Sequence, residues 1–373
     1  MPQSKPLKER IIEHIAANGP MSIGRYMAWC LLDPKQGYYP TRDPLGVDGD
    51  FITAPEISQM FGEVLGLWLI GAWRSMGSPK KIQLVEYGPG RGVMMADILR
   101  AAMLDKDFIS ALNVTLIEPS AALEAKQGEN LASTSVPINW ADRLEDVPKG
   151  PTLIIGNEYL DCLPIRQFVM IDRFKGVGGF HERFVDIPAS KTWKLCYSYA
   201  KKPISAPDIK LLPQDLADFK DDDILEVSLG LAQIVDSINA RFNDAPGAAL
   251  FIDYGHEQTE YGDTFQAIHK HTKVYPLDDP GEADLTARVD FSYLKQMAKA
   301  AGLSVYGPCP QGTFLSRLGI EVRAVALSKA VPKSKEKIAR QLLRLTDSEQ
   351  MGELFKAITL QSNNLPVPLG FKA

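Results

Sequence analysis

Two short segments of the sequence contain the residue types that ligand binding and acid–base chemistry require. The first is Glu86-Tyr87-Gly88-Pro89-Gly90-Arg91-Gly92, in which three glycines alternate with larger residues. Glycines in such a segment let the backbone turn tightly and approach a ligand closely, because no Cβ atom is in the way. The second is Asn157-Glu158-Tyr159-Leu160-Asp161-Cys162-Leu163-Pro164, in which two carboxylates follow an amide. The first segment predicts a cofactor site, and the second predicts a site for a cationic group.

Both segments follow predicted buried strands, at residues 81–86 and 152–156. A helix is predicted over 93–103, immediately after the glycines, and its first turn presents unpaired N–H groups and the positive end of its dipole. Strands that alternate with helices indicate a parallel sheet. Ligands of such open α/β sheets bind at the carboxyl ends of the strands, so we expect both segments to face the same crevice.

Two more acidic residues follow later predicted strands. Glu118 ends a strand over 114–118, where a carboxylate can accept both hydroxyls of a ribose. Asp142 comes just after a strand predicted at 137–140 and is placed to meet the amino group of an adenine. Trp140 is a candidate to stack on the same adenine. These residues predict that the ligand is a nucleoside.

The glycine spacing leaves the class of cofactor open. Dinucleotide-binding folds have the spacing Gly-x-Gly-x-x-Gly and face a pyrophosphate, whereas Gly88, Gly90 and Gly92 are spaced Gly-x-Gly-x-Gly. Glu86 adds a negative charge ahead of them. A negative charge suits S-adenosylmethionine, which carries an ammonium and a sulfonium group but no phosphate, and so favours it over NAD. A turn without any ligand is the third interpretation, and the two later acidic residues disfavour it.

The acidic segment also has two interpretations. Glu158 and Asp161, with Asn157 beside them, are candidates to bind an arginine guanidinium, whose planar fork of N–H donors matches carboxylates. In this interpretation Glu158 accepts the proton that the guanidinium releases, with His256 as the second choice. The alternative is that Glu158 caps the start of a helix and Asp161 is solvated, in which case neither contacts a substrate.

The composition argues against several other classes of protein. The chain has 373 residues and a net charge of −5, whereas a protein that coats nucleic acid needs many cations to neutralise phosphates. The four cysteines include no Cys-x-x-Cys pair, so we expect neither a disulfide framework nor a structural zinc site. His269 and His271 lack a third ligand at a suitable spacing, and we therefore expect no metal ion.

The sequence further predicts a cytoplasmic protein that does not insert into membranes. Its longest apolar run, Val64–Trp73, has ten residues, about half of the roughly 20 that a membrane span needs. We interpret this run as core, with a homodimer interface as the alternative. Near the N-terminus, Lys5, Lys8 and Arg10 are interleaved with glutamates and no apolar signal core is present, which differs from a transit or signal peptide.

Together these segments resemble those of a known family. The sequence resembles the MidA-type methyltransferases, which include the mitochondrial arginine methyltransferases of respiratory complex I assembly and their bacterial relatives. The resemblance extends over nearly the whole chain, and Gly49–Ser58 is its most distinctive part. The motifs that carry it are Gly37-Tyr38-Tyr39, Gly49–Glu63, Val85–Gly92, Ile117–Ser120, Asn157–Pro164, Ile252–Gly255, Ala283–Thr286 and Gln311–Leu315.

The resemblance implies a class I S-adenosylmethionine-dependent fold. For the mitochondrial members it implies symmetric ω-N-dimethylation of an arginine on a complex I subunit, which makes a protein the expected partner. Asp50 and Thr53 lie in the Gly49–Ser58 run, a loop framed by Pro and Gly that is placed to close over the donor and exclude water. The alternative is a structural turn in which Asp50 caps the local backbone, and the resemblance favours the closing loop. An assembly scaffold that keeps the fold without catalysis is the alternative, although such a protein has no need of donor-binding residues.

The order of the predicted elements gives an α/β fold, in which a Rossmann-like sheet is interrupted by an antiparallel insertion. An N-terminal helical and lid region occupies residues 1–76. The methyltransferase core is predicted in two parts, at 77–165 and 226–330, and the second part includes a long substrate loop over 255–290. The β-rich insertion occupies 166–225, and a helical extension follows at 331–373.

Overall fold

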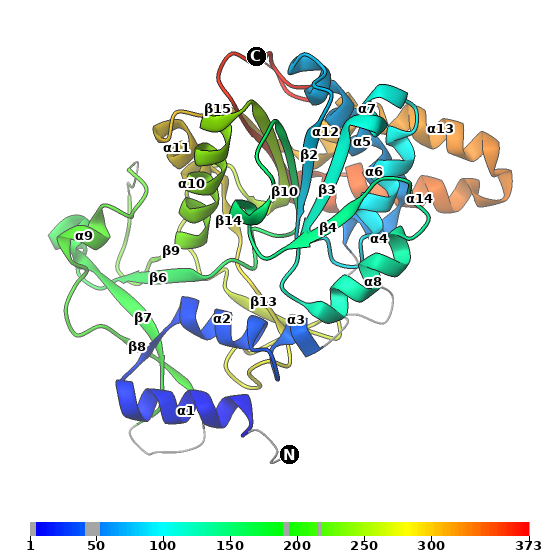
Figure 1. The fold of residues 1–373 in the computed structure, drawn as a ribbon. Helices are drawn as coiled ribbons and strands as arrows, with labels where there is room; N and C mark the ends of the chain where they lie inside the picture. Colours follow the sequence, from blue (N-terminus) through cyan, green and yellow to red (C-terminus); the bar gives the residue numbers. More distant parts are fainter. Residues whose placement is uncertain (1–4, 42–52, 189–193, 215, 217, 373) are drawn as a thin grey trace.

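The computed structural model describes residues 5–41, 53–188, 194–214, 216 and 218–372. An eight-stranded sheet forms its centre, in the order β15-β16-β10-β5-β2-β3-β4, with β14 pairing with β10 beside this path (Figure 1). The strands from β10 to β4 are parallel, while β16 is antiparallel to both β10 and β15. The strands are β2 (Ile82–Tyr87), β3 (Leu112–Ile117), β4 (Ile138–Ala141), β5 (Thr152–Asn157), β10 (Gly247–His256), β14 (Val289–Asp290), β15 (Ser304–Pro310) and β16 (Phe355–Gln361).

The order of the strands leaves a ligand crevice next to β2. The chain runs outward from β2 to β3 and β4, and then returns to β5 on the other side of β2. In an open α/β sheet such a reversal leaves a crevice at the carboxyl ends of the two diverging strands. Tyr87, the last residue of β2, lies opposite Gly156 in β5. The glycine segment and the acidic segment therefore begin side by side.

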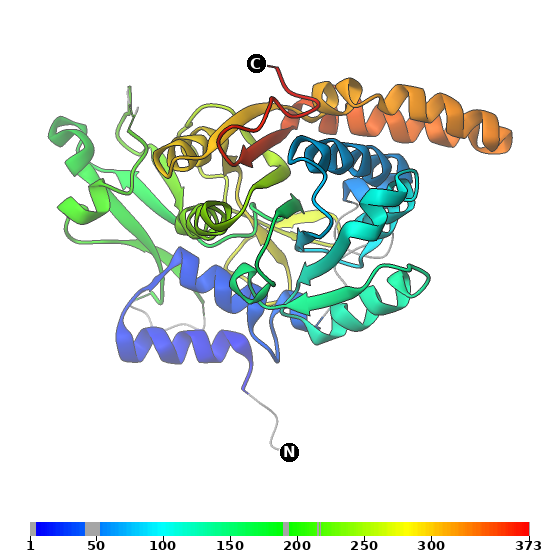
Figure 2. The same ribbon diagram turned by 45° about the horizontal axis from the view of Figure 1, so that its top comes forward.

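Helices cover both faces of this sheet, and two separate cores result (Figure 2). On one face α5 (Gln59–Ser75) and α6 (Val93–Ala102) pack against each other and against the strands. On the other face α10 (Leu229–Asp244) and α11 (Phe291–Ala300) do so. The apolar run Val64–Trp73 lies in α5 and is largely buried, which accounts for its composition without a dimer interface. Among the described residues, no helix has both the length and the apolar character that a membrane crossing requires.

A second sheet, of five antiparallel strands, interrupts the α/β core and confirms the antiparallel insertion of the predicted fold. Its order is β1-β7-β6-β9, with β8 pairing with β7. Because β1 lies between the N-terminal helices α1 and α2, the N-terminal region and the insertion share one sheet (Figure 1). The elements are α1 (Leu7–Asn18), β1 (Met21–Ser22), α2 (Ile23–Leu32), β6 (Ile165–Met170), β7 (Phe180–Asp186), β8 (Cys196–Tyr199) and β9 (Ile224–Ser228).

The segment 255–290, expected to be a long loop, contains a small antiparallel sheet in the order β12-β11-β13, so this expectation is wrong. The strands are too short to show an apolar alternation, and β12 is exposed throughout. The turn between β11 and β12 places Lys270 and His271 at positive φ. α2 packs against β13, which brings this sheet to the N-terminal helices. The strands are β11 (Gln266–His269), β12 (Thr272–Val274) and β13 (Asp284–Thr286).

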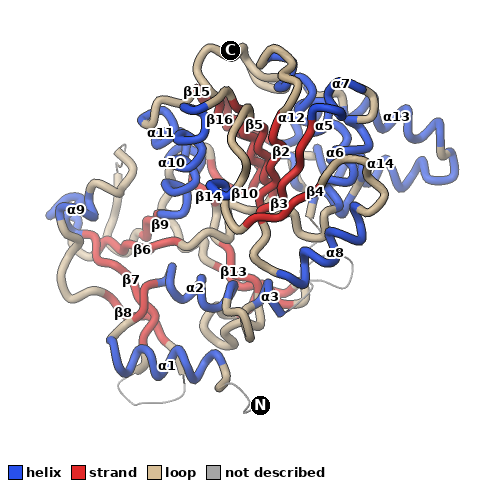
Figure 3. Tube along the Cα trace, in the orientation of Figure 1, coloured by secondary structure: helices blue, strands red, loops and turns tan. Residues whose placement is uncertain are grey.

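The C-terminal part differs from the predicted helical extension. α13 (Ile320–Ala330) and α14 (Lys335–Thr346) form a helical hairpin, but the chain then returns as β16 between β10 and β15 in the main sheet (Figure 3). β16 contains the buried polar residues Lys356, Thr359 and Gln361. These residues interrupt the apolar run that is typical of a central strand, which is why the sequence pattern does not reveal it.

Candidate active site

A cavity of about 640 Å³ opens at the carboxyl ends of β2 and β5. Nine of the predicted site residues line it: Thr53, Glu86, Gly88, Gly90, Glu118, Asp142, Asn157, Glu158 and Asp161. Gly92 and Trp140 do not line it, and Asp50 lies outside the described residues. The glycine segment and the acidic segment therefore face one common space.

The glycine segment requires its glycines for both conformation and space. Gly88, Gly90 and Gly92 have φ angles of 60°, 53° and 78°, in the left-handed region that other residues rarely adopt. A Cβ atom on Gly88 would lie 2.9 Å from Cδ2 of Tyr159, which is closer than packed atoms approach. Gly92 is the N-terminal cap of α6 and does not reach the cavity wall. The segment thus presents bare backbone to the cavity, directly against the loop that follows β5.

Glu86, in β2, is a buried carboxylate without a complete set of partners. It is 1% exposed, and its Oε2 has no hydrogen-bond partner among the described residues. Burial raises its pKa to about 8. A buried acceptor without a donor costs free energy unless a ligand supplies one. Glu86 therefore fits a ligand that brings a hydrogen-bond donor or a positive charge into the cavity.

Glu118 is held by a network that no sequence motif indicates. Its Oε1 accepts a hydrogen bond from the backbone N–H of Ser120 (2.9 Å), and its Oε2 accepts one from Nε2 of Gln127 (3.2 Å). The same Nε2 of Gln127 donates to the carbonyl oxygen of Gly90 (2.8 Å). Gln127 thereby ties the glycine segment to Glu118. Burial raises the pKa of Glu118 to about 7.

This network gives Trp140 a different role from the predicted one. Its indole Nε1 donates a hydrogen bond to Oε1 of Gln127 (2.7 Å), and its ring does not line the cavity. Trp140 therefore orients Gln127 and is not placed to stack on an adenine, so the expected stacking is corrected. Gln127 escapes sequence reasoning because a glutamine within a helix carries no distinctive signal. Asp142, just after β4, does line the cavity.

Glu158 combines an unusual backbone conformation with two hydrogen bonds. Its φ of 51° lies in the left-handed region, where a residue other than glycine is often found at functional sites. Its Oε1 accepts hydrogen bonds from Nδ2 of Asn157 and from the backbone N–H of Ala54, both at 3.0 Å. Ala54 begins α4 (Ala54–Ile57), so Glu158 contacts a helix start, as one interpretation predicted, and also lines the cavity. Burial raises its pKa to about 7.

Asp253 of β10 supports the loop that carries Glu158 and Asp161. Its Oδ2 accepts hydrogen bonds from three consecutive backbone N–H groups, those of Tyr159 (3.0 Å), Leu160 (2.7 Å) and Asp161 (3.2 Å). Asp253 is fully buried and does not line the cavity, so it positions the loop from the protein interior. Burial, followed by the charges of neighbouring carboxylates, raises the pKa of Asp161 well above its ordinary value. Asp161 is thus not the freely solvated residue of the alternative interpretation.

Further polar residues also line the cavity. The hydroxyl of Tyr254 donates to Oγ1 of Thr286 (2.9 Å) and accepts a hydrogen bond from Nε2 of Gln266 (3.1 Å). The hydroxyl of Tyr39 donates to Oδ1 of Asp284 (2.9 Å). All five line the cavity, but no sequence pattern gave them a function. Tyr39, Tyr254, Asp284 and Thr286 do fall within the motifs of the family resemblance, which is the one signal that marks them.

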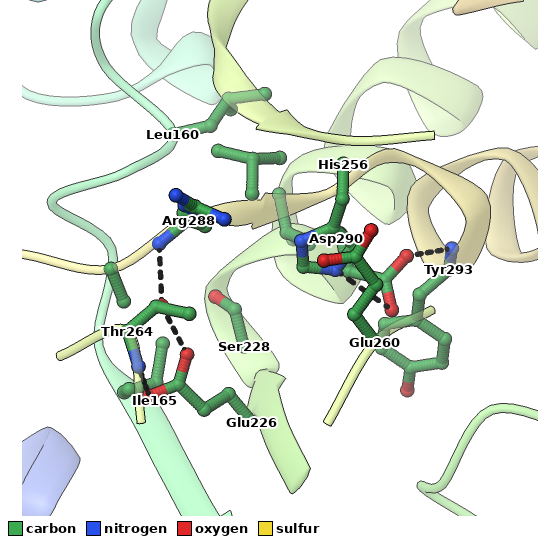
Figure 4. Close-up of a pocket in the computed structure, with 13 residues that line it drawn as sticks. Leu160, Ile165, Glu226, Ser228, His256, Glu260, Thr264, Arg288, Asp290 and Tyr293 are labelled. Atoms are coloured by element: carbon green, nitrogen blue, oxygen red, sulfur yellow. Dashed lines mark hydrogen bonds and ion pairs between the residues drawn. The ribbon is translucent and has the colours of Figure 1, made fainter. Parts of the chain in front are cut away.

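His256, the second choice as proton acceptor, does not line the cavity. It lines a separate pocket of about 20 Å³, which has room for little more than one water molecule. Figure 4 shows it beside Asp290, with Nε2 of His256 3.8 Å from Oδ2 of Asp290. The structure therefore gives His256 no access to the site that Glu158 lines.

Comparisons with known proteins bear on this site. A family model described as "Putative S-adenosyl-L-methionine-dependent methyltransferase" matches residues 64–309. The mitochondrial protein arginine methyltransferase NDUFAF7 of Danio rerio is 36% identical over 379 residues, which cover 95% of this chain and 87% of the relative. NDUFAF7 of Homo sapiens is 37% identical over 382 residues, which cover 95% and 83% of the two chains.

A solved structure extends the comparison to the ligand. The crystal structure of a protein from Burkholderia thailandensis, bound to S-adenosyl-homocysteine, matches this fold with a TM-score of 0.83. The two sequences are 26% identical, and the match covers 98% of this chain and 93% of that chain. S-adenosyl-homocysteine is what S-adenosylmethionine becomes after it loses its methyl group. The comparison confirms the class I methyltransferase fold.

The same comparisons correct the expected location. The relatives from Danio rerio, Mus musculus and Homo sapiens are all named as mitochondrial proteins. This finding contradicts the predicted cytoplasmic location, which rested on the charge pattern of the first residues.

The family model covers more than half of the chain, and the relatives match nearly all of it. The description of the family model agrees with the cavity, which the glycine segment, Glu86 and Glu118 line together. The chain therefore belongs to this family of S-adenosyl-L-methionine-dependent methyltransferases.

Proposed function

We propose that this protein is a protein arginine methyltransferase. The charge of the cavity is the observation that carries this proposal. Among the described residues that line it, seven carry a carboxylate and one, Arg91, carries a cation. Burial raises the pKa of several of these acids, and a bound cation favours their ionised form, so such a wall favours cationic occupants. Both the sulfonium of the donor and the guanidinium of an arginine are cations. The seven are Glu56, Glu86, Glu118, Asp142, Glu158, Asp161 and Asp284.

The proposed acceptor is an arginine on a protein, in line with the names of the relatives. The family resemblance further supports a respiratory complex I subunit as the substrate and symmetric ω-N-dimethylarginine as the product. A guanidinium is the natural ligand of a site with several carboxylates, because its N–H groups form parallel, charge-assisted hydrogen bonds with them.

The donor half of the cavity contains Glu86, Gly88, Gly90, Glu118 and Asp142. Bare backbone at the two glycines admits a ligand close to the chain. The carboxylate of Glu118 is available to ribose hydroxyls, Asp142 to the adenine amino group, and the unpartnered Oε2 of Glu86 to an ammonium group. These residues fit the chemistry of S-adenosylmethionine, which when bound supplies an electrophilic methyl group on its sulfonium.

The acceptor half contains Asn157, Glu158 and Asp161. Their oxygen atoms hold the guanidinium in one orientation, and positioning of this kind supplies much of the rate acceleration of a displacement reaction. A guanidinium that gains a methyl group must release a proton. Glu158 accepts it, because its pKa of about 7 makes it a stronger base than an ordinary glutamate.

Labelling of a cell lysate tests this proposal. Purified protein and tritium-methyl S-adenosylmethionine are added to lysate from cells that lack the protein, with Glu158→Gln protein as the control. We expect a labelled polypeptide with the wild type only, and symmetric dimethylarginine after acid hydrolysis. Label on another amino acid would refute the arginine assignment. A wild type that binds the donor but labels no polypeptide would favour the assembly scaffold instead.

A further inference from the structure

The small sheet β12-β11-β13 contributes a carboxylate to the cavity that the proposed reaction does not yet use. Asp284, the first residue of β13, is 7% exposed and lines the cavity together with Glu158 and Asp161. The backbone N–H of Ala287, just after β13, donates to the carbonyl oxygen of Asp161 (2.9 Å). This hydrogen bond fastens the small sheet to the loop after β5, so that Asp284 and the predicted acceptor residues share one wall.

The hydroxyl of Tyr39 holds the Asp284 carboxylate in place. It donates to Oδ1 at 2.9 Å, and Tyr39 lies in the short helix α3 (Tyr38–Thr41), also on the cavity wall. A hydroxyl that donates to a carboxylate restricts its rotation and fixes the direction in which its oxygen atoms point. An acceptor oriented in this way loses less entropy when a ligand arrives. The pair therefore presents a carboxylate of fixed orientation at the cavity wall.

The donors of a guanidinium point in several directions, so carboxylates from more than one part of the chain can bind it together. An arginine side chain carries five N–H donors and no acceptor. On the protein side, Oε1 of Glu158 already accepts two hydrogen bonds, from Asn157 and from Ala54. Asp284 adds a third carboxylate to the same wall, from a different part of the chain.

A second observation is a buried amide oxygen on the same wall that lacks a hydrogen-bond donor in the part of the chain that the structure describes. Asn157 is 7% exposed and lines the cavity, and its Oδ1 has no hydrogen-bond partner among the described residues. Buried amide oxygens of this kind are normally satisfied. A ligand rich in N–H groups satisfies it, whereas another anion or an apolar group does not.

We infer that Asp284, oriented by Tyr39, is the third carboxylate of the arginine-binding subsite and favours a guanidinium over an ammonium group there. The inference rests on the proposed function. A guanidinium spreads its donors over three nitrogen atoms, so it can bind carboxylates after β5 of the main sheet and in β13 of the small sheet at once. An ammonium has three donors on one atom. A lysine in the subsite meets fewer of these carboxylates with a charge-assisted hydrogen bond, which disfavours it as a ligand.

Calorimetry on protein saturated with S-adenosyl-homocysteine tests the inference without turnover. The probes are Nα-acetyl-arginine amide and Nα-acetyl-lysine amide. For Asp284→Asn we expect at least about tenfold weaker binding of the arginine probe, a loss of the preference over lysine, and affinity for S-adenosyl-homocysteine within about twofold of wild type, as a lost charge-assisted hydrogen bond predicts. The matched control is Asp279→Asn, an exposed aspartate of the same segment that does not line the cavity.

Tyr39→Phe provides a second variant that removes a single oxygen atom. It should weaken binding of the arginine probe in the same direction but less. The double variant should bind no more than about twofold more weakly than Asp284→Asn alone, because the hydroxyl acts through Asp284. Additive losses would refute this positioning role of Tyr39.

Three results would overturn the inference. If wild type binds the arginine probe and Asp284→Asn binds it equally well, the assignment of Asp284 fails and the proposed function stands. If Asp284→Asn loses S-adenosyl-homocysteine as strongly as the arginine probe, Asp284 maintains the fold and is not a binding residue. If wild type binds neither probe and labels no arginine, the proposed function fails and the inference fails with it.

Discussion

The two halves of the cavity are assembled in different ways. The donor half comes from one stretch of chain, from Glu86 to Asp142, in which each residue lies at or just after a parallel strand. The acceptor half combines Tyr39, the loop 157–161 and Asp284, which come from three distant parts of the chain. Local strand-and-turn patterns therefore specify the proposed donor half, whereas the proposed acceptor half depends on how α3, the main sheet and the small sheet meet.

This difference predicts two kinds of failure. A variant of the donor half should lose affinity for S-adenosylmethionine. A variant of the acceptor half should retain that affinity and lose methyl transfer. A donor-half variant that keeps its affinity for S-adenosylmethionine, or an acceptor-half variant that loses it, would show that the cavity is not divided in this way.

The largest effect is expected for Glu158→Gln. Loss of the base should lower kcat by about 10²–10⁴-fold, while calorimetric affinity for S-adenosyl-homocysteine stays within about twofold of wild type. The exposed Glu349→Gln serves as the control. Full activity of the Glu158→Gln protein would remove this residue from the reaction.

Gly90→Val should weaken donor binding by about tenfold or more, because a β-branched residue is strained at a φ of 53°. Gly77→Val is a matched control, since Gly77 has a φ of 84° and no atom lies within 4 Å of the position that its Cβ would take. Both variants should lose stability, measured by thermal melting. Only Gly90→Val should lose donor affinity. An equal loss in the control would show that backbone strain alone is responsible.

Glu118→Ala should weaken binding of S-adenosyl-homocysteine by about tenfold, the value expected for hydrogen bonds to a charged group. Part of this loss arises through Gln127, which Glu118 holds against Gly90. The control is Glu129→Ala, because Glu129 is an exposed residue of α8 (Ala121–Leu131), the helix that contains Gln127. This variant should leave the affinity unchanged. Calorimetry at pH 8 measures both. Unchanged affinity in Glu118→Ala would reject this residue as part of the donor site.

The acceptor half should also respond to pH. Burial raises the pKa of Glu158 to about 7, so below this pH its carboxyl is protonated and neither binds a cation nor accepts a proton. At saturating donor, kcat/KM for the protein substrate should fall by up to about tenfold per pH unit below 7 and level off above it. Initial rates from pH 5.5 to 8.5 test this. A flat profile across pH 7 would contradict the role of Glu158.

The smallest effect concerns stability. Burial raises the pKa of Glu86 from an ordinary value of 4.5 to about 8. Between these values the folded protein keeps a proton that the unfolded chain releases, so the free energy of unfolding falls as pH rises, by up to about 1.4 kcal/mol per pH unit. Glu86→Gln should reduce this fall. Urea unfolding at pH 5.5 and pH 8 measures the change in the free energy of unfolding between these two pH values. An equal change in the wild type and in Glu86→Gln would refute the raised pKa of Glu86.

Residues at or just after a parallel strand are the ones that sequence reasoning placed correctly at the cavity. Glu86, Glu118 and Asp142 were predictable because a strand, a turn and a helix in succession determine where each residue lies. Trp140 was misinterpreted because the direction of its indole depends on a hydrogen bond to Gln127 across two elements. Nothing in the local pattern near Trp140 encodes that contact.

Long-range pairing explains the remaining differences. Asp284 reaches the cavity because β13 pairs with β11 and packs against α2. Likewise β16, with buried Lys356 and Thr359, joins the main sheet through its pairing with β10. The residues around each position in the sequence do not determine such contacts, and they become visible only when the sheets are assembled.

A crystal structure with S-adenosyl-homocysteine and an arginine peptide shows whether the donor and the acceptor share this cavity. We expect the adenosine beside residues 86–92 and Glu118, and the sulfur atom on the side of the cavity where Glu158 and Asp161 hold the guanidinium. A nucleoside bound elsewhere, or a peptide whose arginine does not reach these two carboxylates, would show that methyl transfer does not take place in this cavity.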